Sequence, residues 1–483
     1  MSYSGFSALL AVAALASGGC VALPADRGAA SAARLVETRS TVAATVPRLT
    51  APPDLAADLS KRLISAPIGA TEAVQLALLN SPRMRELYAA LGLSQGEVYD
   101  ATRLANPSLG YLRLTPGAGG GNKTTWSIAQ DFTDLLFLAY RNRVGRAQAL
   151  RAEQLIAHDV LQLEADVREA YYAYVGLQLS ARMRAAAARG ARVSADLAGR
   201  FHDAGNISLL QRSREEAMAS EASIGARRLE AEALAARGRL LTLTGMDLGD
   251  VRIQFAEALS LPVSVSANAA ELQTLAMTQR LDLAALRTET DLRQQQLTHT
   301  GRWRWLGGLA LVGERERELD GETLKGGGAT LELPLFNSGK GRYLRASAQA
   351  ESSAARLAGL ETTIRNDIAV QTMALESARL AVDEYRTRLL PLQEQIVESS
   401  QREQNFMLIG AFEVLAARRE ELDTYERYVD AVRDYWVQRA RLASSVGGKL
   451  PGDEAPGEPL ALPELPPGPV AEAATQSIPG GAQ

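Results

Sequence analysis

The sequence has 483 residues, of which 46% are hydrophobic and 5% aromatic, and its formal net charge is −4. A chain of this length can bury a large core. Its nearly balanced charge excludes the broad basic field that would attract nucleic acid or an anionic membrane surface. Ala, Leu, Arg, Glu and Gln fill the long segments, and these residues favour helices. A mostly helical protein is therefore expected.

The N-terminus carries an apolar run from Phe6 to Ala16, followed by small residues and Cys20, the only cysteine of the chain. The run is too short to span a bilayer and has the length of the apolar core of a signal peptide. Because the cysteine follows directly, the segment resembles a bacterial lipoprotein processing site. We expect residues 1–19 to be a signal peptide and Cys20 to be acylated, for example palmitoylated. An ordinary cleaved signal with an incidental cysteine and a misassigned start codon are the alternatives.

Two segments outside the main body are poor in periodic apolar residues. Residues 20–70 are rich in Ala, Pro and Ser and predict an extended N-terminal arm. Residues 448–483 are dense in Pro and Gly and predict a disordered tail.

Residues 71–247 and 271–447 look like two copies of one plan. "ALLNSPRMREL" (77–87) aligns with "AMTQRLDLAAL" (276–286), "RAQA" (146–149) aligns with "SAQA" (347–350), and Gly205 aligns with Gly410. Heptad seams recur as well. They consist of Leu163, Val167, Ala170, Tyr174 and Leu177 in the first copy and Ile364, Ile368, Gln371, Leu375 and Ala378 in the second.

Each copy predicts the same order of elements. An amphipathic helix (about 71–104 and 271–300) leads into a β-hairpin (106–132 and 303–336), and a helical hairpin follows (137–246 and 338–446). The first helix of each helical hairpin is long enough to reach about 100 Å. Periodic patterns of this length are typical of coiled coils rather than of ordinary core helices.

The predicted strands alternate apolar and polar residues, as expected of strands that face lipid on one side. Leu112 and Leu114 flank Arg113, and "RERELDGETLKG" (315–326) is expected to be a loop. Apolar positions in the last strand are Leu331, Leu333 and Leu335, and Trp126, Trp303 and Trp305 are expected at strand positions of an interfacial aromatic girdle. Ordinary surface hairpins are the alternative.

Four strands alone would leave unpaired edges in lipid, so the chain is expected to oligomerise. A symmetric ring of three copies would supply a twelve-stranded β-barrel. The expected fold is thus mainly α with transmembrane β, in which duplicated coiled-coil hairpins form an α-barrel below that β-barrel.

This plan resembles the TolC-like outer-membrane efflux family over about residues 70–447. The resemblance rests on "TEAVQLALLNSPRMRELYAALG" (71–92), "LELPLFNSGKGR" (331–342), the two glycine turns, and "LLTLTG" (240–245) with "LASSVG" (442–447). It implies a homotrimer in the outer membrane with a helical tunnel in the periplasm, surrounded by outer-membrane lipid. It also implies a periplasmic adaptor (membrane fusion) protein and an inner-membrane pump as partners. Cys20 and the arm point to the branch that serves resistance-nodulation-division (RND) pumps, which export drugs or heavy metals.

By that resemblance the two glycine turns are periplasmic tips that dock the adaptor, the alternative being that the glycines only form turns. The predicted docking residues are Gly205, Ile207, Ser208 and Leu209 in the first tip and Gly410, Phe412, Val414 and Leu415 in the second. Family members narrow the closed tunnel with carboxylates beyond the second tip, where Ala416 and Arg419 stand here. The nearby Glu413 is a substitute acid, and Arg418 and Arg419 could pair across protomers to hold the tip shut, so these three are the candidate gate residues. The alternative is that these charges are solvated or salt-bridged.

No enzyme motif is present. His158, His202 and His299 are far apart, and the sequence has no HExxH motif, His/Cys cluster or phosphate loop. We expect no enzyme activity, no cofactor, no metal site and no nucleic-acid partner. The expected function is a passive trimeric exit duct of a tripartite efflux pump. The alternatives are the exit duct of a type I protein-secretion system and a periplasmic coiled-coil scaffold without a pore.

Overall fold

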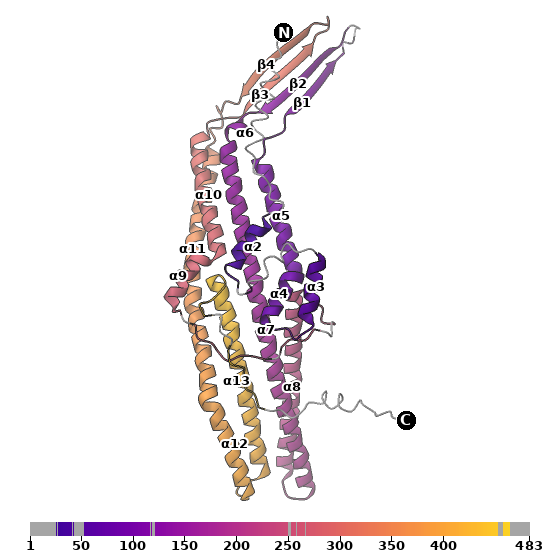
Figure 1. Ribbon diagram of the computed structural model, residues 1–483, viewed down its shortest axis with the longest axis vertical. Coiled ribbons are helices and arrows are strands. Elements are labelled where there is room, and N and C mark those ends of the chain that lie inside the picture. Colours follow the sequence, from indigo (N-terminus) through magenta and orange to yellow (C-terminus); the bar gives the residue numbers. More distant parts are fainter. Residues whose placement is uncertain are drawn as a thin grey trace, which may run out of the picture. The chain divides into compact units, whose positions relative to one another are not determined.

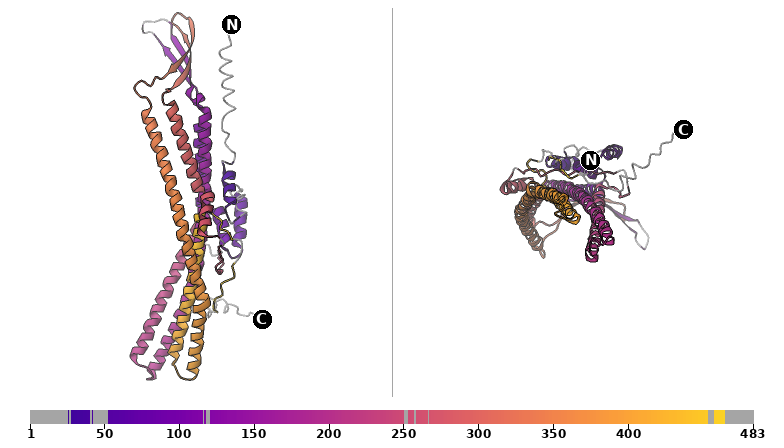
Figure 2. Two further views of the ribbon diagram at one scale, coloured as in Figure 1. Left: turned by 90° about the vertical axis from the view of Figure 1, so that its left-hand side faces the viewer. Right: turned by 90° about the horizontal axis from the view of Figure 1, so that it is seen from below.

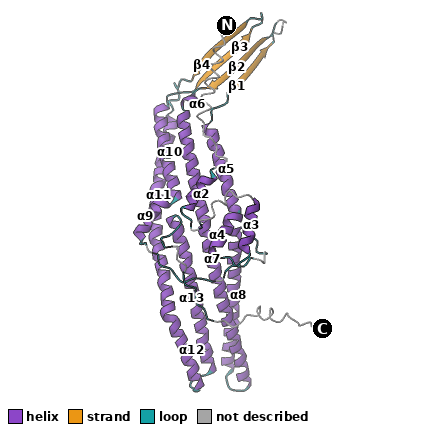
Figure 3. Cartoon of the chain, in the orientation of Figure 1, coloured by secondary structure: helices purple, strands orange, loops and turns teal. Residues whose placement is uncertain are grey.

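A computed structural model describes residues 26, 28–40, 42, 53–115, 117, 121–249, 253–256, 258–265, 267–452 and 457–463. The expected signal peptide, Cys20 and the far end of the tail lie outside the described residues. The chain is mainly helical with one four-stranded sheet (Figure 3). Within the described segments, no helix is both long and apolar enough to cross a membrane.

The chain divides into two compact units. Unit 1 comprises residues 1–35, 85–159 and 280–363, and unit 2 comprises residues 36–84, 160–279 and 364–483. Two long helical stretches contribute residues to both units, and each unit is considered by itself below.

The strands of unit 1 form a single antiparallel sheet in the order β1-β2-β3-β4 (Figure 1). The strands are β1 (Ser108–Leu114), β2 (Lys123–Asp131), β3 (Leu309–Arg317) and β4 (Thr323–Leu331). β1 and β4 are the edge strands, and each has a partner on one side only. The polypeptide thus supplies a sheet with two open edges.

The second β-hairpin differs from its prediction. The segment expected as a loop is mostly strand, because β3 continues through Arg317 and β4 begins at Thr323, which leaves only residues 318–322 as the connection. Charged residues are tolerated there because successive side chains point to opposite faces of an exposed sheet. Leu333 and Leu335 follow the end of β4 and are not strand residues.

The helices of unit 1 form a row. They are α5 (Pro82–Thr102), the first part of α7 (Leu138–Asp203), α10 (Leu281–Trp303) and the first part of α11 (Lys340–Glu384). Polar contacts define the neighbours, α5 with α7, α7 with α10, and α10 with α11. The contacts are Arg141 Nε to Ala101 O (2.9 Å), Thr288 Oγ1 to Gln154 Oε1 (3.2 Å) and Arg287 Nη2 to Glu361 Oε1 (3.1 Å). The short α6 (Thr133–Leu136) joins β2 to α7.

Unit 2 contains a second row of helices, whose two hairpin turns lie at the same end (Figures 1 and 2). It consists of α8 (Leu209–Thr244), the rest of α7, α13 (Ala411–Val446) and α12 (Leu390–Asn405). Contacts again define the neighbours, from α8 to α7, α7 to α13, and α13 to α12. They are Ser194 Oγ to Glu215 (2.7 Å), Ser180 Oγ to Asp430 (3.0 Å) and Tyr425 OH to Glu394 (2.6 Å). α8 and α12 are therefore the outermost helices of this row.

The elements recur along the chain at a nearly constant spacing. α4 (Ala70–Asn80) and α9 (Ala269–Gln279) have equal lengths and lie 199 residues apart. α8 and α13 both have 36 residues, and both end at a left-handed glycine, Gly245 or Gly447. Most seam positions are buried in both copies, whereas Leu177, Gln371 and Ala378 are half-buried.

The second long helix contains a π-helical turn that the first lacks. α7 has 66 residues, and α11, η2 (Tyr385–Leu389) and α12 together run the same length from Lys340 to Asn405. The N–H of Leu390 donates to Tyr385 O, five residues back, directly before Pro391. A π turn accommodates one extra residue within a helix, which accounts for the change in spacing between the copies from 201 residues at the seams to 202 at the tips.

The N-terminal arm and the start of the tail are more structured than predicted. The arm contains α2 (Ala29–Glu37) and α3 (Pro53–Ile64), so its expected extended conformation is wrong. The Lys449 N–H donates to Arg39 O (2.8 Å), and Leu450 is buried. Further along, the Leu460 N–H donates to Leu259 O (2.8 Å). Ser31 on α2 donates to Glu153 of unit 1 (2.7 Å), whereas the start of the tail is held on unit 2 by the two backbone bonds.

Candidate functional site

The two helical tips have the same backbone structure. In the first tip (204–208) the N–H groups of residues 204, 205 and 206 donate to the carbonyls of residues 200, 202 and 201. In the second tip (406–410) the N–H groups of residues 406, 407 and 408 donate to the carbonyls of residues 402, 404 and 403. Every bond recurs 202 residues later, so the tips are structural equivalents.

This equivalence corrects the predicted alignment of Gly205 with Gly410. Gly205 has φ +79°, and its counterpart at the spacing of 202 is Met407, with φ 58°. Gly410 has an extended backbone (φ −85°) and corresponds instead to Ser208, because each is the N-cap of the following helix. A Cβ added to Gly205 would meet nothing within 4 Å. Its left-handed backbone, rather than close approach within the chain, therefore explains this glycine.

The two caps use different groups to satisfy the first turn of the following helix. Ser208 Oγ accepts a hydrogen bond from the Gln211 N–H (3.2 Å). In the second tip the Gly410 N–H donates to Glu413 Oε2 (2.7 Å). A complete capping box contains both bonds, one accepted by the N-cap side chain and one by the side chain three residues later. Each tip has one of the two. Glu413, a candidate gate residue, thus has a structural role in the cap.

The exposed apolar surface of the tips differs from the predicted docking set. Leu209 is 64% exposed, Ile207, Phe412 and Leu415 are half-buried, and Val414 is only 9% exposed. Val414 therefore packs inside the tip rather than on its surface, and the docking role of this set stays a prediction. Phe412 packs edge-on against Phe201, with ring centroids 5.9 Å apart.

The sequence reasoning missed the three most exposed apolar side chains of the second tip. Phe406, Met407 and Leu408 are 76%, 92% and 73% exposed. They directly follow the last residue of α12. The available signal was an apolar run in "NFMLIG" (405–410) at a helix end, where polar turn residues are usual.

The charged residues beyond the second tip are mostly engaged within the chain. Arg418 pairs with Glu421 (2.9 Å), and Arg419 Nη1 lies 3.4 Å from Met218 Sδ on α8. Two further acids, Asp423 and Glu426, bind Arg184 on α7 at 3.1 and 2.8 Å. This arrangement favours the salt-bridged alternative for the acids, and the gate role of Arg418 and Arg419 stays a prediction.

Two carboxylates between α7 and α13 have perturbed pKa values. Burial raises the pKa of Glu426, and the adjacent Arg184 opposes this effect. Burial likewise raises the pKa of Asp430, against the charge of Arg433 and a hydrogen bond from Ser180. The α7–α13 contact therefore contains acids that protonate more readily than ordinary surface carboxylates.

Only one of the three predicted girdle tryptophans is on a strand. Trp126 lies on β2 with its ring centroid 4.6 Å from that of Tyr111 on β1. Trp303 is the last residue of α10, with its ring edge-on to that of Phe137 (5.3 Å), and Trp305 lies beneath the Arg304 guanidinium (4.5 Å). The strand placement of Trp303 and Trp305 is wrong because α10 continues to residue 303.

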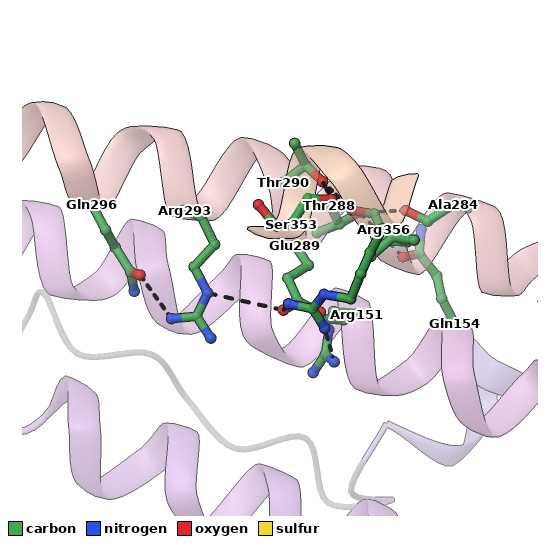
Figure 4. A network of polar contacts seen from close by, with 11 residues as sticks. Arg151, Gln154, Ala284, Thr288, Glu289, Thr290, Arg293, Gln296, Ser353 and Arg356 are labelled. Carbon is green, nitrogen blue, oxygen red and sulfur yellow. Dashed lines mark hydrogen bonds and ion pairs between the residues drawn. The ribbon is translucent and has the colours of Figure 1, made fainter. Parts of the chain in front are cut away.

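Unit 1 also contains a carboxylate that joins three helices (Figure 4). Glu289 on α10 is 8% exposed and contacts Arg151 on α7 at 2.9 Å and Arg356 on α11 at 3.2 Å, with Arg293 at 3.9 Å on its own helix. At the spacing of 199 the first copy has Ala90 in its place. Three guanidinium groups, including that of Arg151 in the first copy, surround one buried carboxylate of the second copy, and the first copy has no carboxylate at the equivalent position.

No protein-family model and no curated protein sequence matches the chain. Solved structures do match. A membrane protein from Pseudomonas aeruginosa has a TM-score of 0.67 at 16% identity, covering 80% of this chain and 92% of that one. The outer membrane protein VceC from Vibrio cholerae has a TM-score of 0.65 at 17% identity, covering 78% and 96%. The CmeC outer membrane channel of Campylobacter jejuni has a TM-score of 0.64 at 14% identity, covering 83% and 87%.

Proposed function

We propose that this chain, which has the fold of the TolC-like outer-membrane channels, is the trimeric exit duct of a tripartite efflux pump. It would passively release small molecules, drugs or heavy-metal ions, across the bacterial outer membrane. The observation that carries the proposal is the open-edged sheet. Because β1 and β4 each lack a second partner, insertion in lipid would require neighbouring copies to close the edges, and three copies give twelve strands.

The duplication supports the same assembly in unit 2. Within one chain, Tyr172 on α7 stacks on Trp436 on α13, with ring centroids 5.1 Å apart. Tyr172 of the first copy corresponds to Met373 of the second at the seam spacing of 201. Trp436 of the second copy corresponds to Leu234 of the first at the tip spacing of 202. They are 76% and 52% exposed. We place these two side chains against each other between neighbouring protomers, as a copy of the Tyr172–Trp436 contact.

The tips supply a surface for a periplasmic adaptor protein. Phe406, Met407 and Leu408 form an exposed apolar cluster, and Leu209 and Leu210 form a smaller one in the first tip. Exposed apolar clusters of this kind are typical of protein-interaction sites. The adaptor would connect the duct to an inner-membrane pump, which we propose is of the RND type. Acylation of Cys20 would add a lipid anchor.

The test begins with location and conductance. We expect the mature protein in the outer-membrane fraction, a trimer in detergent by native mass spectrometry, and ion conductance in planar bilayers. Recovery as a soluble periplasmic monomer would instead support the scaffold alternative. Sensitivity of a deletion strain to metals, dyes and antibiotics would then identify the substrate class, whereas a specific loss of protein export would favour the secretion duct.

A paired substitution tests the proposed interface. Leu234→Asp should place a charge in the protomer contact and shift the protein from trimer to monomer. Val193→Asp is the matched control, because Val193 is 60% exposed and its counterpart at the spacing of 202, Gln395, is also exposed. Equal trimer content in the two variants would contradict the proposed interface.

A further inference from the structure

The strand register sorts the sheet residues onto two chemically different faces. Side chains of directly paired residues lie on the same face. One such row crosses all four strands through Tyr111, Trp126, Arg315 and Lys325. The next row toward the hairpin loops contains Arg113, Thr124, Arg317 and Thr323. We call this side of the sheet the cationic face.

The cationic face is graded along the strands. The row on the other side of the aromatic row contains Leu109, Ile128, Gly313 and Gly327. The next row contains Gln130, Leu311 and Ala329, and the pair Leu309 and Leu331 ends this mainly apolar part of the face. From there toward the loops, the face passes from apolar to aromatic to cationic. This order matches the depth profile of a leaflet, with acyl chains, an interface rich in Trp and Tyr, and charged headgroups.

The opposite face carries the acids, and Leu112, Leu114 and Leu324 lie on it as well. Lys123 on that face is bound by Glu316 and, at 3.0 Å, by Glu318, and Glu314 also lies there between Ser127 and Gly326. Charges of either sign are costly in the hydrocarbon core. The opposite face places Glu314 in mid-strand beside small and polar residues, whereas the cationic face carries Leu109, Ile128, Tyr111 and Trp126 at that level. We therefore assign the cationic face to the membrane side of the sheet.

The four cations of the cationic face have no acidic partners. Within the described part of the chain, Arg113, Arg315, Arg317 and Lys325 make no ion pair, and all four are exposed. Lys123, on the acidic face, contacts two carboxylates. The chain thus neutralises the cation on one face and leaves the cations of the other face available to an external anion.

We infer that Arg113, Arg315, Arg317 and Lys325 bind the phosphate groups of phosphorylated glycolipids in the outward-facing leaflet. Guanidinium groups bind phosphate oxygens in a bidentate manner, and a row of cations beside Tyr111 and Trp126 fits a headgroup that sits above acyl chains. This inference rests on the proposed function, because it requires the sheet to lie in a membrane.

The test uses the full-length trimer in phosphatidylcholine vesicles containing lipid A or its dephosphorylated form. Native mass spectrometry then counts the glycolipid molecules retained after extraction in mild detergent. We expect lipid A to be retained, and the combined variant R113Q, R315Q, R317Q and K325Q to retain at least about tenfold less, since each cation near a charged surface contributes measurably. The charge-matched control replaces four exposed helix arginines, Arg228, Arg388, Arg402 and Arg427, by Gln and should retain lipid A normally.

Three results would overturn the inference. They are equal retention of dephosphorylated lipid A by the wild type, unchanged retention of lipid A by the four-residue variant, and displacement of lipid A by excess inorganic phosphate, which would indicate a small-anion site. Planar-bilayer conductance separates this failure from failure of the proposed function. A variant that conducts but still retains lipid A contradicts only the inference, whereas a wild-type protein that neither inserts nor conducts contradicts the proposed function itself.

Discussion

The first and second helical tips share three backbone hydrogen bonds of the turn at a spacing of 202 residues, yet they differ at each position that constrains the turn. The first tip places glycine at the left-handed position and serine at the N-cap, whereas the second places Met407 and Gly410 there. The first exposes polar Asn206 where the second exposes Leu408. The copies thus conserve backbone geometry, and the second gives up the favoured turn residues for an apolar surface.

The largest expected effect would test whether the second tip is the stronger docking surface. Replacing Phe406, Met407 and Leu408 by Ser should weaken binding of the cognate adaptor by on the order of a hundredfold, because three large apolar side chains would no longer be buried. The double change Leu209→Ser and Leu210→Ser in the first tip should cost about tenfold. Surface plasmon resonance with the purified adaptor measures both effects, and Leu93→Ser, on an exposed site in unit 1, is the control. Equal losses of adaptor affinity from the changes at the two tips would contradict the proposal that the second tip is the stronger docking surface.

A second difference between the copies is the Glu289 cross-link, which the first copy lacks. Glu289→Gln should destabilise the protein by about 2 kcal/mol, because three arginine side chains would lose their shared carboxylate. Thermal unfolding followed by circular dichroism in detergent measures the change. Glu361→Gln, which breaks the more exposed pair with Arg287, should cost under about 1 kcal/mol. If the two variants have the same melting temperature, the Glu289 network contributes no more stability than the exposed pair.

The backbone comparison predicts effects of opposite sign at equivalent positions. Gly205→Val should destabilise the first tip by about 1–2 kcal/mol, since a branched side chain is disfavoured at positive φ. Met407→Gly should stabilise the second tip by up to about 1 kcal/mol for the same reason. Hydrogen exchange at the tip amides reports each effect locally. Faster exchange in both variants would show that Met407 is not strained.

Periodicity and turn residues predicted the order of helices and strands, but not the details that give the copies different uses. The seams through Leu163 and Ile364 were visible because burial repeats at heptad spacing. The π turn before Pro391 was also encoded, since the spacing between matched motifs changes from 201 residues ("RAQA" and "SAQA") to 202 ("LLTLTG" and "LASSVG").

Other features had no reliable local signal. A methionine with a left-handed backbone, as at position 407, is unusual. Gly205 was therefore aligned with the nearby Gly410 instead of with Met407. The length of β3 depends on pairing with β2, a contact between residues far apart in the chain. The proposed docking residues Phe406 to Leu408 left a weaker signal, the apolar run in "NFMLIG" (405–410).

The smallest expected effect concerns pH and the equivalent helices α8 and α13. Glu426 and Asp430 on α13 correspond to Ile224 and Arg228 on α8, so only the second copy places carboxylates there. Burial raises the pKa of both acids. The stability that this shift contributes is therefore fully present below the pKa values of the unfolded chain, and it is lost as the pH rises through the higher pKa values of the folded protein.

The double variant Glu426→Gln and Asp430→Asn should remove this dependence. Its melting temperature relative to the wild type should rise as the pH increases from about 4.5 to about 7. Glu376→Gln provides a control of opposite sign, because a hydrogen bond from Arg379 lowers the pKa of Glu376. In that variant the relative melting temperature should fall as the pH increases, because the contribution of the lowered pKa in the wild type becomes fully present only above the pKa of the unfolded chain. If the relative melting temperatures of the two variants change with pH in the same direction, burial between α7 and α13 does not raise the pKa of Glu426 and Asp430.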